Sequence, residues 1–311
     1  MSLTISLDPV FQEHKTGRHP ESPARLEAIR KRLTDQRLSE LATRGTVRRA
    51  TLEEVTRIHG RDYVSRLEKL AADRGGRLDA DTVMSPASFE VAMKAAGSAI
   101  AAVDAVLKGD STRALCLVRP PGHHALADEA MGFCLLNNVA IAAAHARAHH
   151  RLDRVLIVDW DVHHGNGTQD LFYGDSQVVF FSSHRFPFWP GSGGKDETGT
   201  GAGLGATFNL PLPYGTKPVD FRKAFEAMLF DAVRKARPQL ILLSAGFDAH
   251  RDDPVGDLGL GNEDFDLLTT LICEVADREC GGKLVSLLEG GYNVDRLAEC
   301  VEIHAQGMAK T

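Results

Sequence analysis

Four side chains that can bind a metal or move a proton follow one apolar run of the chain. The run is Val-Leu-Ile-Val at 155–158, and Asp159, Asp161, His163 and His164 come directly after it. Apolar, β-branched runs of this length indicate a buried strand. Residues two apart at a strand end face the same side, so we expect Asp161 and His163 to point into one site.

A third metal ligand is available at the end of another apolar run, where Asp248 follows residues 239–244. Two carboxylates and one imidazole make a three-ligand zinc site with one open position. Zinc in such a site polarises a carbonyl group and acidifies a water molecule. A structural cluster of paired Asp and His is the alternative, and the combination of Asp161, His163 and Asp248 disfavours it.

Two adjacent histidines, His123 and His124, follow a third apolar run and suit proton transfer. Asp159 and Asn166 are the side chains expected to fix the tautomers of these imidazoles. A second tandem pair at 149–150 lies at an expected helix end, and we predict that it has no function. For His164 we expect a packed, structural role.

Three further residues could complete such a site. Tyr292 follows two glycines, which allow a close backbone approach, and a phenol there could donate to a developing oxyanion. Phe133 and Trp189 stand on separate loops and could wall a narrow apolar channel. His59, which precedes Gly60, is expected to be a cation at the C-terminus of a helix rather than a ligand.

Alternating strand and helix patterns must position these residues, and they predict a parallel sheet with helices on both faces. Polar clusters follow four of the predicted strands, so they should meet at one edge. The loop at 75–86, with Asp79 and Asp81, is expected to be solvated, whereas the long loop at 184–205 is expected to be functional. The apolar runs that predict strands are 3–7, 113–118, 155–158, 177–183, 239–244 and 283–288.

Composition narrows the class of protein. The 311 residues are 43% hydrophobic and 25% charged, which is typical of a globular protein with a sizeable core. The net charge of -6, with no basic stripe, argues against nucleic acid as a partner. Five scattered cysteines predict a reducing compartment. No stretch approaches the ~18 apolar residues of a membrane span, so we expect a soluble, cytoplasmic protein.

Five segments together resemble the zinc-dependent histone deacetylase family, in order and in spacing, over nearly the whole chain. Asn166 and the G-F-D-A-H segment are more similar to the class II branch and its bacterial deacetylase-like and acetylpolyamine amidohydrolase relatives. The five segments are R-P-P-G-H-H-A (119–125), G-F-C-L-L-N-N (132–138), V-D-W-D-V-H-H-G-N-G-T (158–168), S-A-G-F-D-A-H-R-D-D-P (244–254) and L-E-G-G-Y-N (288–293).

The resemblance implies the arginase/deacetylase fold, an α/β fold with a central eight-stranded parallel sheet, in a single catalytic domain at 1–311. It makes His124 the general base and acid, with His123 as its electrostatic neighbour, held by Asp159. Asn166 would partner His124 where class I enzymes place Asp, which should make His124 a weaker base. Tyr292 would polarise the acetyl carbonyl. One Zn²⁺ per chain would be bound by Asp161, His163 and Asp248.

The resemblance also implies substrate contacts and structural potassium. The carbonyl of Gly132 would receive the substrate amide N–H, and Phe133 and Trp189 would form the channel walls. Arg25 resembles the arginine of an internal acetate-exit channel. Potassium is expected at an inner site formed by Asp159, Asp161, His163 and Ser182, and at an outer site formed by Phe172, Asp175 and Val178.

The predicted reaction is removal of acetyl, or another acyl group, from the side-chain amine of N-acyl-lysine in proteins. An acetylpolyamine amidohydrolase is the nearest alternative, favoured by an acidic residue at the channel mouth; Asp79, Asp81 and Glu197 are the candidates. A non-catalytic acyl-lysine binding module and an arginase-like two-metal hydrolase are weaker alternatives. A homo-oligomer is possible.

Overall fold

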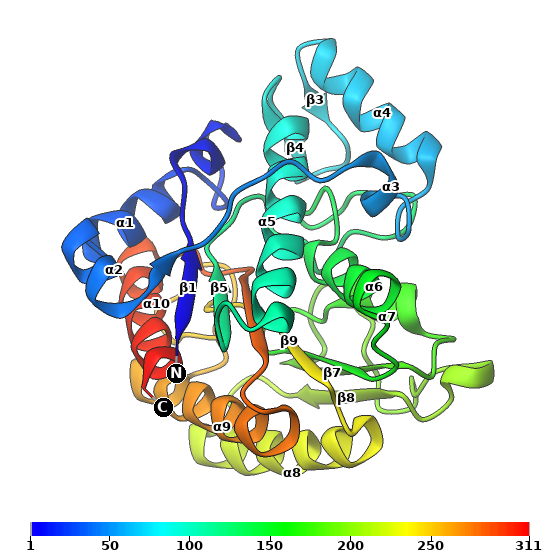
Figure 1. Ribbon diagram of the computed structural model, residues 1–311, viewed down its shortest axis with the longest axis vertical. Helices are drawn as coiled ribbons and strands as arrows, with labels where there is room; N and C mark the ends of the chain where they lie inside the picture. The colour runs from blue at the N-terminus through cyan, green and yellow to red at the C-terminus, as the bar shows by residue number, and fades with distance from the viewer. Residues whose placement is uncertain (1, 311) are drawn as a thin grey trace.

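A parallel sheet of eight strands forms the centre of the molecule, and Figure 1 shows helices covering both of its faces. The computed structural model describes residues 2–310, without the side chains of residues 35, 36 and 38, so both ends of the predicted domain 1–311 lie outside the described residues. The strand order is β2-β1-β5-β10-β9-β6-β7-β8. The strands are β1 Leu3–Ser6, β2 Thr43–Arg44, β5 Arg113–Cys116, β6 Val155–Asp159, β7 Val178–Arg185, β8 Thr207–Leu212, β9 Leu240–Ala245 and β10 Leu284–Leu288.

The helices α5, α6 and α7 lie on one side of the sheet, and α8, α9 and α10 lie on the other (Figure 1). Strands covered on both faces need continuous apolar runs, and every residue of β5, β6, β9 and β10 is buried. The helices are α1 Ala24–Arg32, α2 Asp35–Leu41, α3 Leu52–Val55, α4 Arg61–Ala72, α5 Ser88–Lys108, α6 Asn138–His150, α7 Asn166–Phe172, α8 Pro218–Ala236, α9 Asn262–Cys280 and α10 Val294–Ala309.

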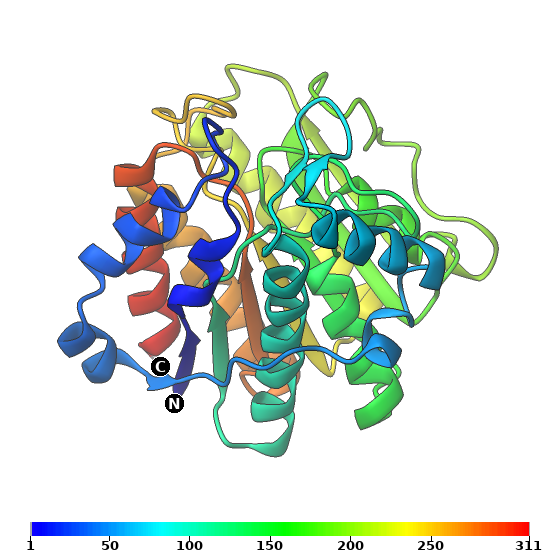
Figure 2. The same ribbon diagram turned by 90° about the horizontal axis from the view of Figure 1, so that it is seen from above.

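The parallel direction gathers the loops that follow the strands at one edge of the sheet. Figure 2 shows these loops together at the top of the view, with both chain ends at the opposite edge. A small antiparallel pair, β3 Gly76–Arg77 and β4 Val83–Met84, stands beside the gathered loops within the segment 75–86. The candidate functional residues that follow these strands therefore lie on one side of the molecule.

The predicted fold class is confirmed, and six of the eight strands lie where the apolar runs indicated. The two missed strands, β2 and β8, are the edges of the sheet. An edge strand needs no continuous apolar run, because one side of its backbone is unpaired. Both residues of β2 are exposed, and β8 contains Asn209 and Pro211.

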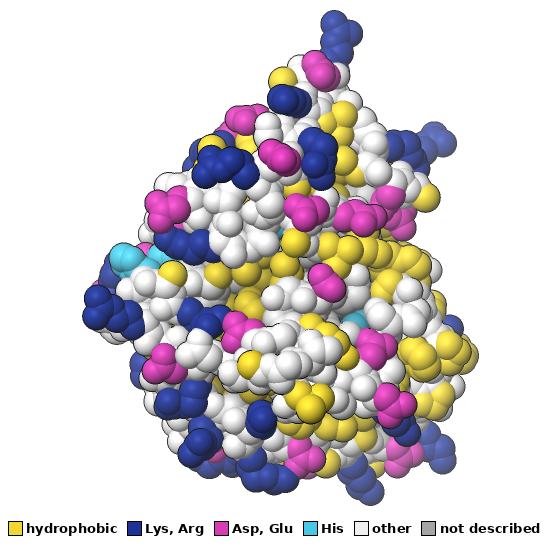
Figure 3. All heavy atoms as spheres, turned by 90° about the vertical axis from the view of Figure 1, so that its right-hand side faces the viewer, with side chains coloured by type: hydrophobic (Ala, Val, Ile, Leu, Met, Phe, Trp, Pro, Cys, Tyr) yellow, Lys and Arg dark blue, Asp and Glu magenta, His cyan; other side chains and the backbone are white. Residues whose placement is uncertain are grey.

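The surface carries charges of both signs. Figure 3 shows basic and acidic side chains interspersed over one face, with apolar side chains between them. Among the described residues, no helix is long and apolar enough to cross a membrane.

Candidate active site

The ends of β6 and β9 bring Asp161, His163 and Asp248 together. Their potential ligand atoms all lie within 4.8 Å of one another, and all three side chains are buried. His163 Nδ1 lies 3.1 Å from Asp161 Oδ1 and 3.2 Å from Asp248 Oδ2. Glycine is required at position 290, because an added Cβ would lie 2.1 Å from Asp248 Oδ2 and 2.6 Å from Asp161 Oδ2. The ends of the two strands thus bring these three side chains to one place, as expected from parallel strands.

The donor set fits a divalent metal ion. One proton on His163 Nδ1 cannot serve both carboxylates, and Asp248 Oδ2 is a buried oxygen without a hydrogen-bond partner among the described residues. Burial, and then the neighbouring Asp161, raise the pKa of Asp248 to about 7. Two carboxylates and an imidazole converging in a buried place match the ligands that zinc takes in catalytic sites.

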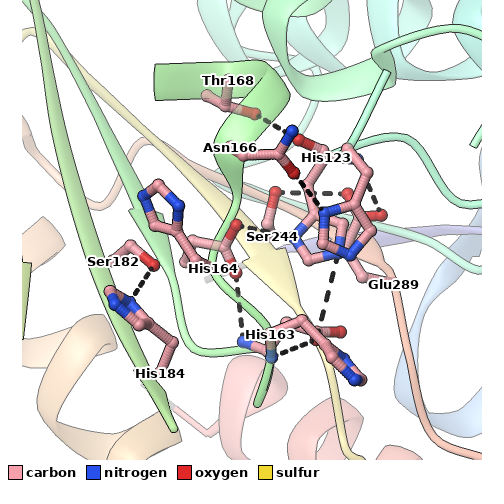
Figure 4. A network of polar contacts seen from close by, with 12 residues as sticks. His123, His163, His164, Asn166, Thr168, Ser182, His184, Ser244 and Glu289 are labelled. Carbon is pink, nitrogen blue, oxygen red and sulfur yellow. Dashed lines mark hydrogen bonds and ion pairs between the residues drawn. The ribbon is translucent and has the colours of Figure 1, made fainter. Parts of the chain in front are cut away.

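His123 and His124 lie beside this group with their ring centroids 3.8 Å apart and their ring planes tilted by 40°, but they have different partners. The His123 Nδ1–H donates to Asp159 Oδ2 at 2.9 Å, whereas the His124 Nδ1–H donates to Asn166 Oδ1 at 2.7 Å. Figure 4 shows Asn166 reaching the pair from the start of α7. The predicted partner of each imidazole is therefore in contact with it.

The two imidazoles have opposite pKa shifts. Burial alone would lower the pKa of His123, but Asp159, Asp161 and then Glu289 outweigh it and raise the pKa to about 10. The pKa of His124 lies well below its usual value because of burial and then the neighbouring His123 and His163. Such a divergence separates a charged from a neutral imidazole in one site.

A narrow pocket of about 180 Å³ leads to these residues, smaller than the ~300 Å³ at which ligand pockets commonly begin. The predicted residues Gly132, Phe133, Trp189 and Tyr292 all line it. Burial, followed by the nearby Asp248, holds the pKa of Tyr292 well above its usual value. The phenol therefore keeps its proton at neutral pH. The pocket suits a slim, unbranched chain.

Two residues of the pocket lining, Phe188 and Val255, were not predicted from the sequence. Phe188 stacks on His163 with centroids 5.1 Å apart, although the adjacent Trp189 was the expected wall. Val255 adds an apolar surface. Asp81, one of the three acidic candidates for the channel mouth, also lines the pocket and is half-buried. Its N–H donates to Asp79 Oδ1 at 2.8 Å, and its carbonyl lies 2.8 Å from His19 Nε2.

Glu289 is a further buried residue that sequence reasoning missed. Its carboxylate accepts hydrogen bonds from the Gly122 and His123 N–H groups, at 2.7 and 3.2 Å, and from the Ser244 hydroxyl. Figure 4 shows Glu289 and Ser244 beside His123. Burial raises the pKa of Glu289 to about 7. A charged residue directly before Gly-Gly at a strand end was the available signal.

Arg25 lies behind Tyr292, with its guanidinium 5.1 Å from the centre of the phenol ring. Its Nε–H donates to the Gly291 carbonyl at 2.7 Å, and it pairs with the buried Glu21 at 3.2 Å. The contacts hold the turn that carries Tyr292. An exit channel at Arg25 stays a prediction.

The residues expected to bind potassium lie in two groups. Asp159 pairs with Ser182 across β6 and β7, near Asp161 and His163, while Phe172, Asp175 and Val178 surround the turn between α7 and β7. Ser182 Oγ lies 3.0 Å from His184 Nδ1, and Arg147 already pairs with Asp175. Potassium at either place stays a prediction.

Two other histidines, His164 and His59, have structural contacts. His164 bonds to Gln169 and Ser192 at 3.0 and 2.8 Å, and burial, then His184, lower its pKa to about 3, in keeping with a packed role. The expectation for His59 is wrong: it is buried, and burial lowers its pKa to about 4, so it is no cation. Its Nδ1–H donates to the Leu126 carbonyl, and its Nε2 accepts from the Asn137 N–H.

Comparison with known proteins places this geometry in context. Residues 19–308 match the family model described as the histone deacetylase domain. The histone deacetylase-like amidohydrolase of Pseudomonas aeruginosa is 38% identical over 94% of this chain and 77% of its own length. The human polyamine deacetylase HDAC10 is 43% identical over 90% of this chain, but only 43% of its own length. The solved HDA15 HD domain superposes with a TM-score of 0.93 at 32% identity, over 99% of this chain and 88% of that one.

Proposed function

The chain belongs to the histone deacetylase family of amidohydrolases, and from that membership we propose that it removes acyl groups from N-acyl-lysine in proteins in a zinc-dependent reaction. One observation supports this most strongly: Asp161, His163 and Asp248 converge beside the histidine pair at the end of a narrow pocket. We assign the zinc to these three residues. When bound, zinc would polarise the amide carbonyl and increase the acidity of a water molecule.

His124 is the proposed general base and acid. Its Nδ1–H is engaged by Asn166, so Nε2 is the nitrogen left to accept a proton. The lowered pKa keeps this nitrogen free of a proton at neutral pH. In our proposal, Nε2 takes a proton from the attacking water and later delivers it to the leaving lysine amine.

His123 and Tyr292 are proposed to stabilise negative charge in the transition state. His123 stays cationic because its Nδ1–H donates to the Asp159 carboxylate, and its ring centroid lies 3.8 Å from that of His124. Tyr292 keeps its hydroxyl proton and can donate it to the oxygen of the former carbonyl. Phe133 and Tyr292 meet edge to face at 5.7 Å, which fixes the phenol beside one pocket wall.

An acetylated polyamine is the second candidate substrate, and Asp81 is the observation that favours it. Of the three acidic residues considered for the channel mouth, it is the one that lines the pocket, whereas Glu197 binds the Gly193 and Gly194 N–H groups. The second, cationic amine of an acetylpolyamine would be stabilised by carboxylates. Val255, however, contributes an apolar surface to the same lining, and this surface favours the alkyl chain of a lysine. We therefore place acyl-lysine first.

The test is a comparison of kcat/KM for an acetyl-lysine peptide and N-acetylputrescine, with the zinc-loaded protein and a chelator-treated control. We expect the peptide to be hydrolysed at least about tenfold more efficiently, and neither substrate after chelation. The reverse preference would replace acyl-lysine by a polyamine. Peptide binding without hydrolysis by the zinc-loaded protein would instead indicate a non-catalytic binding module.

A further inference from the structure

A second group of metal-binding side chains lies where α6 ends beside α5. His145 and His149 are one helical turn apart, so their imidazoles share a face of α6, and His150 follows directly. Asp104 of α5 faces all of them. The gathered loops of the active site lie at the other end of α6, which begins at Asn138. Figure 3 shows histidine side chains, in cyan, grouped at one edge of the molecular surface.

The contacts in this group converge on one carboxylate. His145 Nε2 and His150 Nε2 each lie 2.7 Å from Asp104 Oδ1. His149 stacks on His145 with centroids 5.0 Å apart and ring planes 15° apart. Potential ligand atoms of Asp104, His149 and His150 all lie within 4.8 Å of one another. The group is thus already compact without any rearrangement of the helices.

The chemistry of these donors selects a class of ion. Two imidazoles and a carboxylate prefer Zn²⁺, Cu²⁺ or Ni²⁺ to Mg²⁺ or Ca²⁺. Ligands of a tetrahedral zinc ion stand ~3.3 Å apart, so the 2.7 Å contact between His150 and Asp104 needs to open by only a few tenths of an ångström. The C-terminus of α6 adds partial negative charge, which favours a cation.

The charged surroundings are compatible with such an ion. Lys108 lies 3.7 Å from the other oxygen of Asp104, Oδ2, so it does not cover Oδ1. Arg48 interacts electrostatically with Asp104, and Glu54 interacts electrostatically with His145. Arg48 and Glu54 also form an ion pair at 2.7 Å, so their charges offset each other. His145 is buried, whereas His149 is exposed and leaves solvent access to the site.

We propose that Asp104, His149 and His150 form a peripheral site for one divalent transition-metal ion, separate from the active site. His145 is a positioning residue: its hydrogen bond orients the Asp104 carboxylate and its ring stacks on His149, as residues behind metal ligands do. The ion fastens the end of α6 to α5, and it therefore stabilises the folded protein. The site does not depend on the proposed hydrolysis.

Metal content provides the test. Protein equilibrated with Zn²⁺ and dialysed should hold two equivalents, and His149→Ala/His150→Ala should hold one. Asp248→Asn should also hold one, and that equivalent should disappear when Asp248→Asn is combined with His149→Ala/His150→Ala. The matched control is Asp110→Asn, a nearby exposed carboxylate outside the group, which should leave two equivalents.

Cu²⁺ gives an independent readout. Added to Asp248→Asn, it should give an electron paramagnetic resonance spectrum with hyperfine coupling to two imidazole nitrogens. His149→Ala should lose one coupling and weaken Cu²⁺ binding at least about tenfold. His145→Ala should keep both couplings but weaken binding. A single zinc equivalent in the wild type, or an unchanged spectrum in His149→Ala, would overturn the proposal.

Discussion

At the scale of single residues, one hydrogen-bond partner separates two neighbouring imidazoles. His123 donates to the Asp159 carboxylate, whereas His124 donates to the neutral Asn166 amide. Only His123 therefore has an anionic partner that stabilises its protonated form. Their short separation then increases the difference, because the cationic His123 further lowers the pKa of the buried His124. A cation and a neutral base can therefore stand side by side at neutral pH.

Tyr292→Phe removes the hydroxyl that we propose for the oxyanion. We expect kcat/KM on an acetyl-lysine peptide to fall about 100-fold or more, as for loss of one oxyanion donor. Zinc content should not change, because Tyr292 is not among the proposed ligands. The exposed Tyr214 offers a matched control, since Tyr214→Phe should keep full activity. Full activity in Tyr292→Phe would contradict the role.

The site was predictable where side chains follow strands, and less so elsewhere. Asp161, His163 and Asp248 could be placed because parallel strands must end at one edge. Asp81 and Phe188 could not, because irregular loops carry them and no periodic pattern fixes where such loops fold back. Glu289 was overlooked although it follows a strand, since a lone acid before glycines resembles an ordinary turn.

At the scale of elements, the loop before α6 is tightly constrained at Gly132. Its φ of +56° is in the left-handed region, and a Cβ there would lie 2.5 Å from His124 Cδ2 and 2.5 Å from Trp189 Cη2. A side chain at this position would therefore displace the proposed base or the pocket wall.

Gly132→Ala should therefore lower kcat/KM at least about tenfold and the free energy of unfolding by about 1 kcal/mol, the cost of a left-handed residue. Steady-state kinetics and urea denaturation measure the two effects. Gly174→Ala is the control, because nothing lies within 4 Å of its added Cβ. Equal kinetics in the two variants would show that the loop adapts freely.

His59 joins three elements, because it follows α3, accepts from the N-cap residue of α6 and donates to the loop at Leu126. Its folded pKa of about 4 lies below the ordinary 6.5, so the unfolded chain binds the extra proton. The stability that it contributes is full above pH 6.5 and is lost as the pH falls toward 4.

Between pH 7 and pH 5, the protonation of His59 should lower the free energy of unfolding by about 2 kcal/mol. His59→Gln retains a donor and an acceptor without the titration. Its free energy of unfolding, from urea denaturation at the two pH values, should fall by about 2 kcal/mol less than that of the wild type. An identical fall in both proteins would exclude His59 as the source.

The strand prediction succeeded at the centre of the sheet and failed at its edges, for one physical reason. Central strands such as β6 and β9 are covered on both faces and must be apolar throughout. β2 and β8 have no such requirement, and their short or mixed sequences resemble loops. The number of eight strands came from the family resemblance and not from the pattern.

At the scale of the whole molecule, the zinc binding that we propose at Asp161, His163 and Asp248 should also contribute to the free energy of unfolding. Buried Asp161 and Asp248 face each other with one imidazole between them, so the metal-free site is electrostatically strained. Chelation of zinc should lower Tm by on the order of 5 °C. Calorimetry on His149→Ala/His150→Ala, which should lose the proposed peripheral site, isolates this effect. An unchanged Tm after chelation would contradict zinc binding at these residues.

The two edges of the sheet have consequences for how copies of this chain can associate. The carbonyls of Ala206 and Leu212 accept from the Phe180 and Phe186 N–H groups, so the alternate residues of β8 face its outer edge, where the Thr207 N–H already donates to the Thr198 carbonyl and where Pro211 lies. Proline has no N–H to offer there, and at the other edge β2 is only two exposed residues long. A second chain therefore cannot form a continuous ladder of hydrogen bonds along either edge. This disfavours fibrous aggregation. Association of two copies edge to edge through β2 or β8 is therefore disfavoured.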